Sequence, residues 1–120
     1  MQILVLLLLF QTKHFVFDFL YQPPYQYRNK GTYGHPGGIV HALQHAVPTF
    51  LILWWGLTPL FAASLALAEF LIHYHIDWAK MSLNKKLGWG PLTSENFWRL
   101  LGFDQFLHQL TYVWLIWMAL

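Results

Sequence analysis

The chain has 120 residues, of which 57% are apolar and only 10% are charged, whereas soluble domains carry about 25% charged residues. A domain this small exposes much surface for its volume, so the composition argues against a free soluble monomer, and its hydrophobicity argues against intrinsic disorder. The absence of cysteine excludes a disulfide framework and a thiolate metal site, and the formal net charge of +2 is too small to indicate nucleic-acid binding.

Long uncharged segments predict the helices. No charged side chain occurs in residues 1–12, 31–68 or 105–120. Because about 20 helical residues cross the hydrocarbon core of a bilayer, residues 31–68 are too long for one crossing, and Gly56–Pro59 is a turn signal that divides them. We therefore expect an all-α, four-helix antiparallel transmembrane bundle that forms a single domain over residues 1–120. Its helices are expected at about residues 2–22, 38–55, 58–80 and 96–120.

The positions of the basic residues predict how this bundle is oriented. In an up-down-up-down bundle, the polar segments at about residues 23–37 and 81–95 lie on one side of the membrane, and all seven basic residues lie on that side or just inside it. Since cytoplasmic loops carry an excess of Lys and Arg, we expect both segments in the cytoplasm. The membrane is expected to be a bacterial inner membrane, with both termini on its non-cytoplasmic side. Residues 1–10 are apolar like a signal peptide, but no basic residue precedes them and no cleavage motif follows, which favours a retained first span.

The polar side chains inside the predicted helices recur at intervals of four residues. Residues four apart lie on one face of a helix, so each helix carries a polar stripe. The first helix contributes His14 and Asp18, the second His41 and His45, the third Glu69, His73 and Asp77, and the fourth Asp104 and His108. An antiparallel arrangement brings these stripes to the same depth, and we expect the nine side chains to converge in one place.

Several carboxylates in one buried place need compensation. One unpaired charge in hydrocarbon costs at least about 2.5–3.5 kcal/mol, and neighbouring carboxylates repel one another. A divalent metal ion would compensate them, because ligands of His nitrogen and carboxylate oxygen suit zinc, which we favour, and also manganese or iron(II). Interhelical hydrogen bonds between the same residues are the alternative interpretation.

The predicted centre holds one or two ions. Its predicted metal ligands are His14, Asp18, His41, His45, His73, Asp77, Asp104 and His108. Glu69 lies about 12 Å from Asp77 along the helix, at 1.5 Å per residue, so it is expected outside a single coordination shell and is the predicted catalytic general base. Gln22, Lys80 and Gln105 are expected to hydrogen-bond to the ligands and orient them.

Four short motifs follow one another along the chain: His14–Gln22 fits H-x-x-x-D-F-x-x-Q, His41–His45 fits H-x-x-x-H, His73–Lys80 fits H-x-x-x-D-x-x-K, and Asp104–His108 fits D-Q-x-x-H. In this order they resemble the pattern of a small, uncharacterised bacterial and phage membrane-protein family, domain-of-unknown-function family 3307. That family has no established activity, so the resemblance implies a shared polar constellation and no particular reaction. More remotely, the layout is similar to that of inner-membrane metal-dependent hydrolases, which is an analogy of layout alone.

Three functions are compatible with this pattern, and whether the protein is an enzyme stays open. The favoured function is a membrane-embedded metal-dependent hydrolase of a lipid-like or anionic substrate, in which the ion lowers the pKa of water to about 7 and Glu69 or Asp77 acts as the base. The chain has no His-Glu-x-x-His motif and no nucleophile elbow that would name the reaction. The alternatives are a structural or accessory membrane subunit clamped by metal and a transporter for protons or divalent cations. The expected partners are the lipid bilayer and another membrane protein or a second copy of this chain; no nucleic acid is expected.

Overall fold

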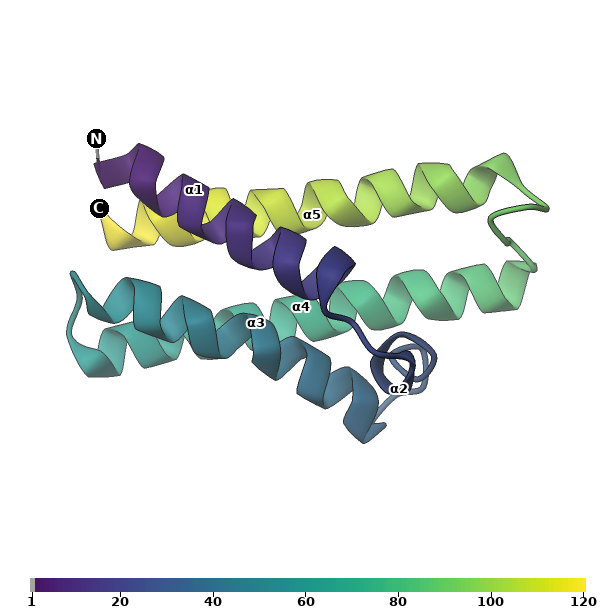
Figure 1. Cartoon of the computed structure of the whole chain (residues 1–120), viewed down its shortest axis with the longest axis horizontal. Helices are drawn as coiled ribbons and strands as arrows, with labels where there is room; N and C mark the ends of the chain where they lie inside the picture. Colours follow the sequence, from purple (N-terminus) through teal and green to yellow (C-terminus); the bar gives the residue numbers. More distant parts are fainter. Residues whose placement is uncertain (1) are drawn as a thin grey trace.

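A computed structural model describes residues 2–120, and this part of the chain contains helices and no strand. The first helix, α1 (Gln2–Phe15), continues directly into a π-helical turn, η1 (Val16–Leu20). A short helix, α2 (Pro24–Tyr27), precedes three long helices, α3 (Pro36–Trp54), α4 (Pro59–Leu87) and α5 (Glu95–Ala119). We count α1 with its continuation η1 as a fourth long helix beside α3, α4 and α5. These four long helices run alternately up and down, and both ends of the chain lie at one end of the bundle (Figure 1). The predicted all-α class is confirmed.

Local sequence signals set the helix ends. Thr58 accepts a hydrogen bond from the backbone N of Phe61 at the start of α4, and Ser94 accepts one from the backbone N of Asn96 at the start of α5. These bonds satisfy amide groups that have no partner within the helix. Gly88, at φ 67°, ends α4 in the left-handed conformation that glycine adopts without a steric penalty.

The helix α4 is longer than the sequence analysis predicted. Its end was expected near residue 80, but it continues to Leu87, so the polar segment expected at 81–95 shrinks to residues 88–94. Lys85 and Lys86 lie in this added length of helix. Lysine has good helix propensity, and a positive charge in the last turn favours the negative end of the helix dipole, so the same residues extend the helix.

The long helices pack as a closed ring, in which α1 and α4 each contact α3 and α5. Apolar side chains from all four fill the interior at the end that holds the termini. We call this region the terminal core, and it comprises Phe10, Leu53, Ala62, Leu65, Tyr112, Leu115 and Ile116. The rings of Phe10 and Tyr112 stack with centroids 5.4 Å apart. The terminal core thereby fixes the positions of the helices from which the polar stripes project.

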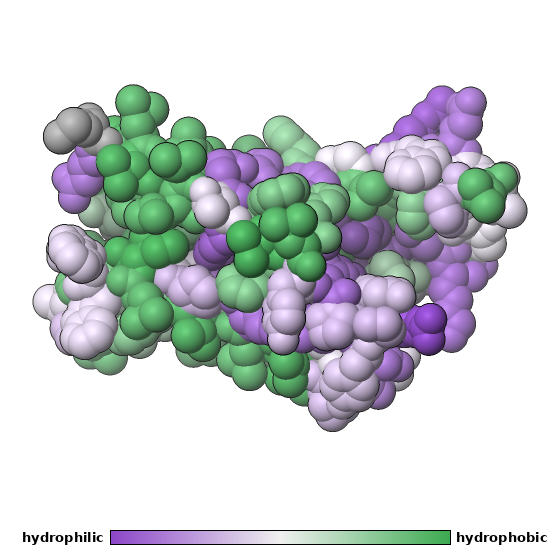
Figure 2. Space-filling model, in the orientation of Figure 1, coloured by the Kyte–Doolittle hydropathy of each residue, from purple (hydrophilic) through white to green (hydrophobic). Residues whose placement is uncertain are grey.

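Apolar side chains also cover much of the outside of the bundle. Large apolar side chains that are at least 65% exposed include those of Leu4, Leu8, Trp55, Leu60 and Trp117. Figure 2 shows that the hydrophobic surface is concentrated toward the end that holds the termini, whereas the opposite end is more hydrophilic. The molecule therefore has an apolar half and a polar half along its long axis.

Two helical segments in residues 2–120 are long and apolar enough to cross a membrane, whereas four were expected. They are Gln2–Leu20 and Pro59–Leu87, and core helices of soluble proteins or N-terminal signal sequences reach the same length and hydropathy. The helices α3 and α5 fall short because they contain polar stripe residues together with residues such as Pro48 and Arg99. The four-span arrangement therefore stays a prediction.

Candidate metal centre

The four polar stripes meet in one buried cluster between the long helices. We call it the polar cluster, and it comprises His14, Asp18, His41, His45, His73, Asp77, Asp104 and His108, whose side chains are at most 4% exposed. Each of these side chains lies within 3.9 Å of at least one other member. Eight of the nine side chains that were expected to converge thus do so.

Four possible ligating atoms within this cluster lie close together. This group comprises Nε2 of His41, His45 and His73 and Oδ1 of Asp18. The Asp18 oxygen lies 3.0 Å from each of the first two nitrogens and 3.9 Å from the third, and the His41 and His73 nitrogens are 3.2 Å apart. Zinc bonds of about 2.0–2.1 Å place tetrahedral ligands about 3.3 Å apart, so these separations fit one metal ion. All four ligating atoms lie within 4.8 Å of one another.

The position of Asp18 depends on the π-helical turn η1. The backbone N of Tyr21 donates to the Val16 carbonyl at 2.7 Å, across five residues instead of four, and such wider turns occur frequently at functional sites. His14, one turn before Asp18, was predicted as a metal ligand. Its Nδ1 contacts the Tyr112 hydroxyl at 2.8 Å and its Nε2 contacts Gln105 Oε1 at 2.7 Å, with Asp18 Oδ2 3.4 Å away. Both ring nitrogens therefore have protein partners, and the role of His14 as a metal ligand stays a prediction.

A second group of possible ligands adjoins the first through His73, and it consists of His73, Asp77 and His108. His108 Nε2 lies 3.4 Å from Asp77 Oδ1 and 3.5 Å from Asp104 Oδ1. These three atoms are buried and have no hydrogen-bond partner within residues 2–120. Capacity to coordinate a cation is therefore present on this side of the cluster too.

Lysine side chains neutralise three of the four buried carboxylates. The pairs are Lys13–Glu69, Lys30–Asp77 and Lys80–Asp104, and the second and third have N···O distances of 3.0 Å. Asp18 is the fourth carboxylate, and no lysine or arginine in residues 2–120 forms a salt bridge with it. A buried charge without compensation is strongly destabilising. The unmatched negative charge therefore coincides with the first ligand group.

Sequence reasoning missed Lys13 and Lys30, which it placed on the polar side of the bundle. Lys13 could have been found, because a lysine beside a long apolar segment calls for a buried partner. Lys30 could not have been found, because it follows α2 in a segment without periodicity. Its contact with Asp77 joins residues 47 positions apart and arises only in the folded chain. Burial lowers the pKa of Lys30, but the carboxylates of Asp77 and Asp18 outweigh that effect and hold it above its ordinary value. Lys30 therefore stays charged at neutral pH.

The other predicted site residues have identifiable contacts. Glu69 pairs with Lys13 one turn deeper than the polar cluster, and its role as general base stays a prediction. Gln105 bridges His14 and Asp104, and Lys80 donates to Asp104. Gln22 instead donates to the backbone carbonyl of Asp18 at 2.9 Å.

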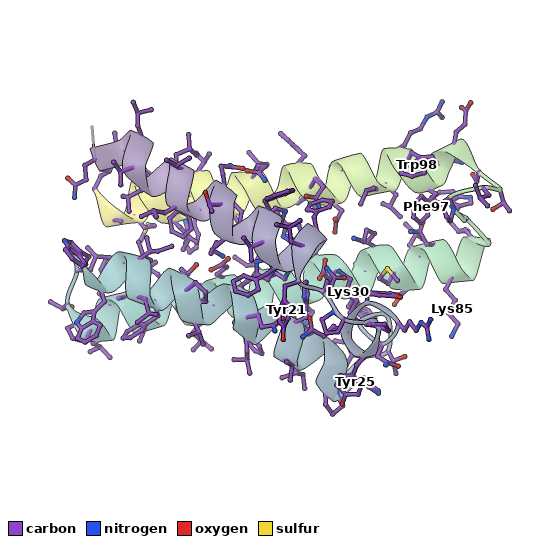
Figure 3. All side chains as sticks on the ribbon, in the orientation of Figure 1. Tyr21, Tyr25, Lys30, Lys85, Phe97 and Trp98 are labelled. Carbon is purple, nitrogen blue, oxygen red and sulfur yellow. The ribbon has the colours of Figure 1, made fainter. Side chains whose placement is uncertain are left out.

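A cavity of about 260 Å³ reaches Asp18 from the polar half of the molecule. Its lining includes Lys30, which lies against α4, and Phe97, near the start of α5 (Figure 3). A larger hollow of about 510 Å³ lies beside the terminal core and is lined mostly by apolar side chains of α1 and α3. The smaller cavity is the one that reaches Asp18, and a separate cavity of about 380 Å³ between α4 and α5 reaches Asp104.

Comparison with known proteins identifies the family. The sequence profile of the family described as "Protein of unknown function (DUF3307)" matches residues 3–120, so the chain belongs to this family. No curated protein and no solved structure matches the chain. The resemblance carried by the four motifs is confirmed, and the function has to be inferred from the site.

Proposed function

We propose that this member of the DUF3307 family is an integral membrane protein that binds one divalent metal ion in its polar cluster. The proposed ligands are Asp18, His41, His45 and His73. The observation that carries the proposal is that the one buried carboxylate without a lysine partner faces three imidazole nitrogens at 3.0–3.9 Å. Ligands of nitrogen and oxygen suit zinc, manganese or iron(II), and four ligands at tetrahedral separations favour zinc.

The charge balance favours one ion over two. In the second group, Lys30 already neutralises Asp77, and Lys80 neutralises Asp104. A second divalent ion would lie close to both ammonium groups and be repelled by them. The metal content of the purified protein therefore tests the number of ions as well as the existence of the site.

Outward-facing residues support a position in the membrane for all four long helices. The stripe residues of α3 and α5, which lower the hydropathy of these helices, are buried in the cluster. The exposed large side chains on these helices are mainly apolar and include Leu43, Val47 and Leu51 of α3 and Phe106, Leu110 and Val113 of α5. Each Å² of apolar surface left in water costs about 25 cal/mol, so a lipid environment stabilises this surface.

The proposed topology puts the half that contains Lys85, Lys86 and Arg99 in the cytoplasm and both termini outside. Because the chain lacks cysteine, Lys86→Cys and Gln2→Cys each introduce a single label site at an exposed position. A membrane-impermeant maleimide should label the Gln2→Cys variant in intact cells and the Lys86→Cys variant only after permeabilisation. The reverse pattern would contradict the orientation.

Metal-dependent hydrolysis is the activity that we propose for this centre. A bound divalent ion supplies Lewis-acid chemistry and lowers the pKa of water. Asp77 is the nearest carboxylate outside the four proposed ligands, since its Oδ2 lies 3.1 Å from His41 Nε2, and its Oδ1 has no hydrogen-bond partner within residues 2–120. It is therefore placed to accept a proton, and the cavity at Asp18 would admit a substrate.

A structural metal clamp is the second candidate function. Four protein ligands fill a tetrahedral ion, so hydrolysis would need the ion to expand to five ligands, as catalytic zinc does in some transition states, whereas a clamp needs no open position. The ligands come from η1, α3 and α4, so one ion would cross-link three segments of the bundle. Transport is less well supported, because the terminal core closes the bundle beyond the cluster with Phe10, Leu53 and Leu115, each at most 2% exposed.

The test is the metal content of the detergent-purified chain, measured by plasma mass spectrometry after incubation with zinc, manganese or iron(II) and removal of free ions. We expect one ion per chain in the wild type, and loss of that ion in His45→Ala and His73→Ala. The matched control is His75→Ala, which removes an exposed histidine from the same helix as His73. A wild type that holds no ion, or a control that loses it, would contradict the metal centre. Hydrolysis that requires the ion and fails in Asp77→Asn would favour the enzyme over the clamp.

A further inference from the structure

The cavity that reaches Asp18 has the features of a binding site for an anion. We infer that, once the metal ion is bound, this cavity takes the phosphate group of an amphiphilic molecule. The inference rests on the proposed metal centre and names the substrate class of that site. The cavity has a volume of about 260 Å³, far above the ~10–15 Å³ that one water molecule needs by the same measure, so it holds more than a single small ion.

Hydrogen-bond donors in the cavity wall suit an oxyanion. Lys30 and Lys80 both line it. Each ammonium has three N–H donors, and each makes one bond of 3.0 Å to a carboxylate behind it, on Asp77 and Asp104 respectively. Donors therefore remain on both groups, and lysine binds phosphate as a point charge.

An unpartnered amide provides a second, independent sign of a missing ligand. Asn84 lines the same cavity and is 7% exposed, and its Oδ1 has no hydrogen-bond partner within residues 2–120. Buried polar side chains are normally satisfied, and Asn84 lies on α4, one turn beyond Lys80. The unpartnered Oδ1 is an acceptor and takes a donor such as the P–OH of a monoprotonated phosphate, while the amide NH₂ of the same side chain donates to the other phosphate oxygens.

The charges around the cavity make anion binding depend on the metal ion. Counted with all histidines neutral, the ionised groups are the carboxylates of Asp18, Asp77 and Asp104 and the ammonium groups of Lys30 and Lys80. Their formal charges sum to −1, and a divalent ion at Asp18 changes the sum to +1. The empty centre therefore repels an anion and the loaded centre attracts it.

Apolar walls distinguish an amphiphile from a free anion. Phe19, Met81, Phe97 and Leu101 line the same cavity as the lysines, and the side chain of Phe19 is 56% exposed. A hydrocarbon chain attached to the phosphate would cover this surface, whereas inorganic phosphate would leave it exposed. We therefore expect the amphiphile to bind more tightly than the free ion.

The experiment is isothermal titration calorimetry on the full chain, loaded with zinc in an uncharged detergent. The probes are dioctanoyl phosphatidic acid, inorganic phosphate and, as the neutral control, dioctanoylglycerol. We expect phosphatidic acid to bind at least tenfold more tightly than inorganic phosphate, and dioctanoylglycerol to give no saturable binding. The metal-free chain should bind none of the three.

Two variants and one matched control connect this binding to the cavity. Lys80→Met and Asn84→Asp should each weaken phosphatidic acid binding at least tenfold with unchanged zinc content, and the near-isosteric Asn84→Asp keeps the test valid if Lys80→Met does not fold. Lys86→Met, which removes an exposed lysine from the same helix, should leave binding within twofold of the wild type.

Several results would overturn the inference. A chain that holds one zinc ion but binds no phosphatidic acid overturns it and leaves the metal centre intact. Equal affinity for inorganic phosphate overturns the amphiphile and indicates a free-anion site. Equal binding without metal, or equal weakening by Lys86→Met, indicates nonspecific attraction to the polar half. A chain that holds no metal overturns the proposed function and this inference together.

Discussion

The terminal core and the polar cluster are built on the same four helices and are equally buried, yet they differ in how their contacts are satisfied. In the terminal core, side chains such as Phe10, Leu53 and Leu115 are at most 2% exposed and pack by shape alone. In the polar cluster, five buried polar atoms lack a hydrogen-bond partner within residues 2–120. They are His45 Nδ1, His73 Nδ1, Asp77 Oδ1, Asp104 Oδ1 and His108 Nε2. The comparison teaches that one region supplies stability and the other retains capacity to bind a ligand.

The boundary between the two regions is the Lys13–Glu69 pair. The ammonium group of Lys13 also donates to the backbone carbonyl of His45 at 3.1 Å and lies 4.7 Å from the centroid of the Tyr112 ring. It therefore contacts the polar cluster on one side and the terminal core on the other. Changes at this pair should affect the stability of the bundle without removing a proposed metal ligand.

The largest effect is expected from breaking that boundary pair. Lys13→Met leaves the Glu69 carboxylate buried and unpaired, and loss of one partner of a buried ion pair costs about 3–5 kcal/mol of unfolding free energy. The double variant Lys13→Met/Glu69→Gln should recover most of this loss with its metal content unchanged. Chemical unfolding in detergent measures the unfolding free energy of the single and the double variant. A double variant that is no more stable than the single one would contradict the pairing.

A comparable effect on stability, without an effect on metal, is expected in the terminal core. Leu115→Ala creates a cavity at a fully buried position, and such changes cost about 2–5 kcal/mol. The control is Leu110→Ala, which shortens a 47% exposed side chain on the same helix. Metal content should equal that of the wild type in both variants. If Leu115→Ala lost the ion, the two regions would not be separable.

Removal of the metal ion should have a smaller effect that is confined to the polar cluster. An ion present at 100 times its dissociation constant stabilises the folded state by about 2.7 kcal/mol, so a chelator should lower Tm while the terminal core preserves the helical circular dichroism signal. Asp18→Asn should abolish this response. It also removes the unmatched buried charge, so the metal-free variant should be more stable than the metal-free wild type. A variant that still responds to zinc would assign the ion to other ligands.

The smallest effect is expected where neither region is involved. Glu95 and Arg99 form a surface pair at 3.3 Å, with side chains 88% and 73% exposed. Exposed ion pairs contribute at most about 1 kcal/mol, so Glu95→Gln should change the unfolding free energy by less than that and leave metal content and anion binding unchanged. A larger change would show that the start of α5 contributes to the stability of the bundle.

Local patterns in the sequence were enough to predict the helices and most of the polar cluster. The four-residue spacing of His41 with His45 and of His73 with Asp77 places each pair on one helix face whatever the rest of the chain does. Those stripes lie in the antiparallel bundle at one depth, as predicted. The same local reasoning ended α4 too early, because a polar composition does not by itself break a helix.

Only the tertiary structure decided which charges are matched. Lys30 meets Asp77 across 47 residues and Lys13 meets Glu69 across 56, and no periodicity predicts contacts between segments so far apart. The π-helical turn at Asp18 could not be predicted from the sequence either, because the pattern assumes the four-residue hydrogen-bond spacing of an α-helix and the turn has a spacing of five. The sequence by itself therefore determined which side chains gather inside the bundle. The fold determined that Asp18, alone among the four buried carboxylates of residues 2–120, is left without a lysine, because ion pairing depends on distances that only long-range packing creates.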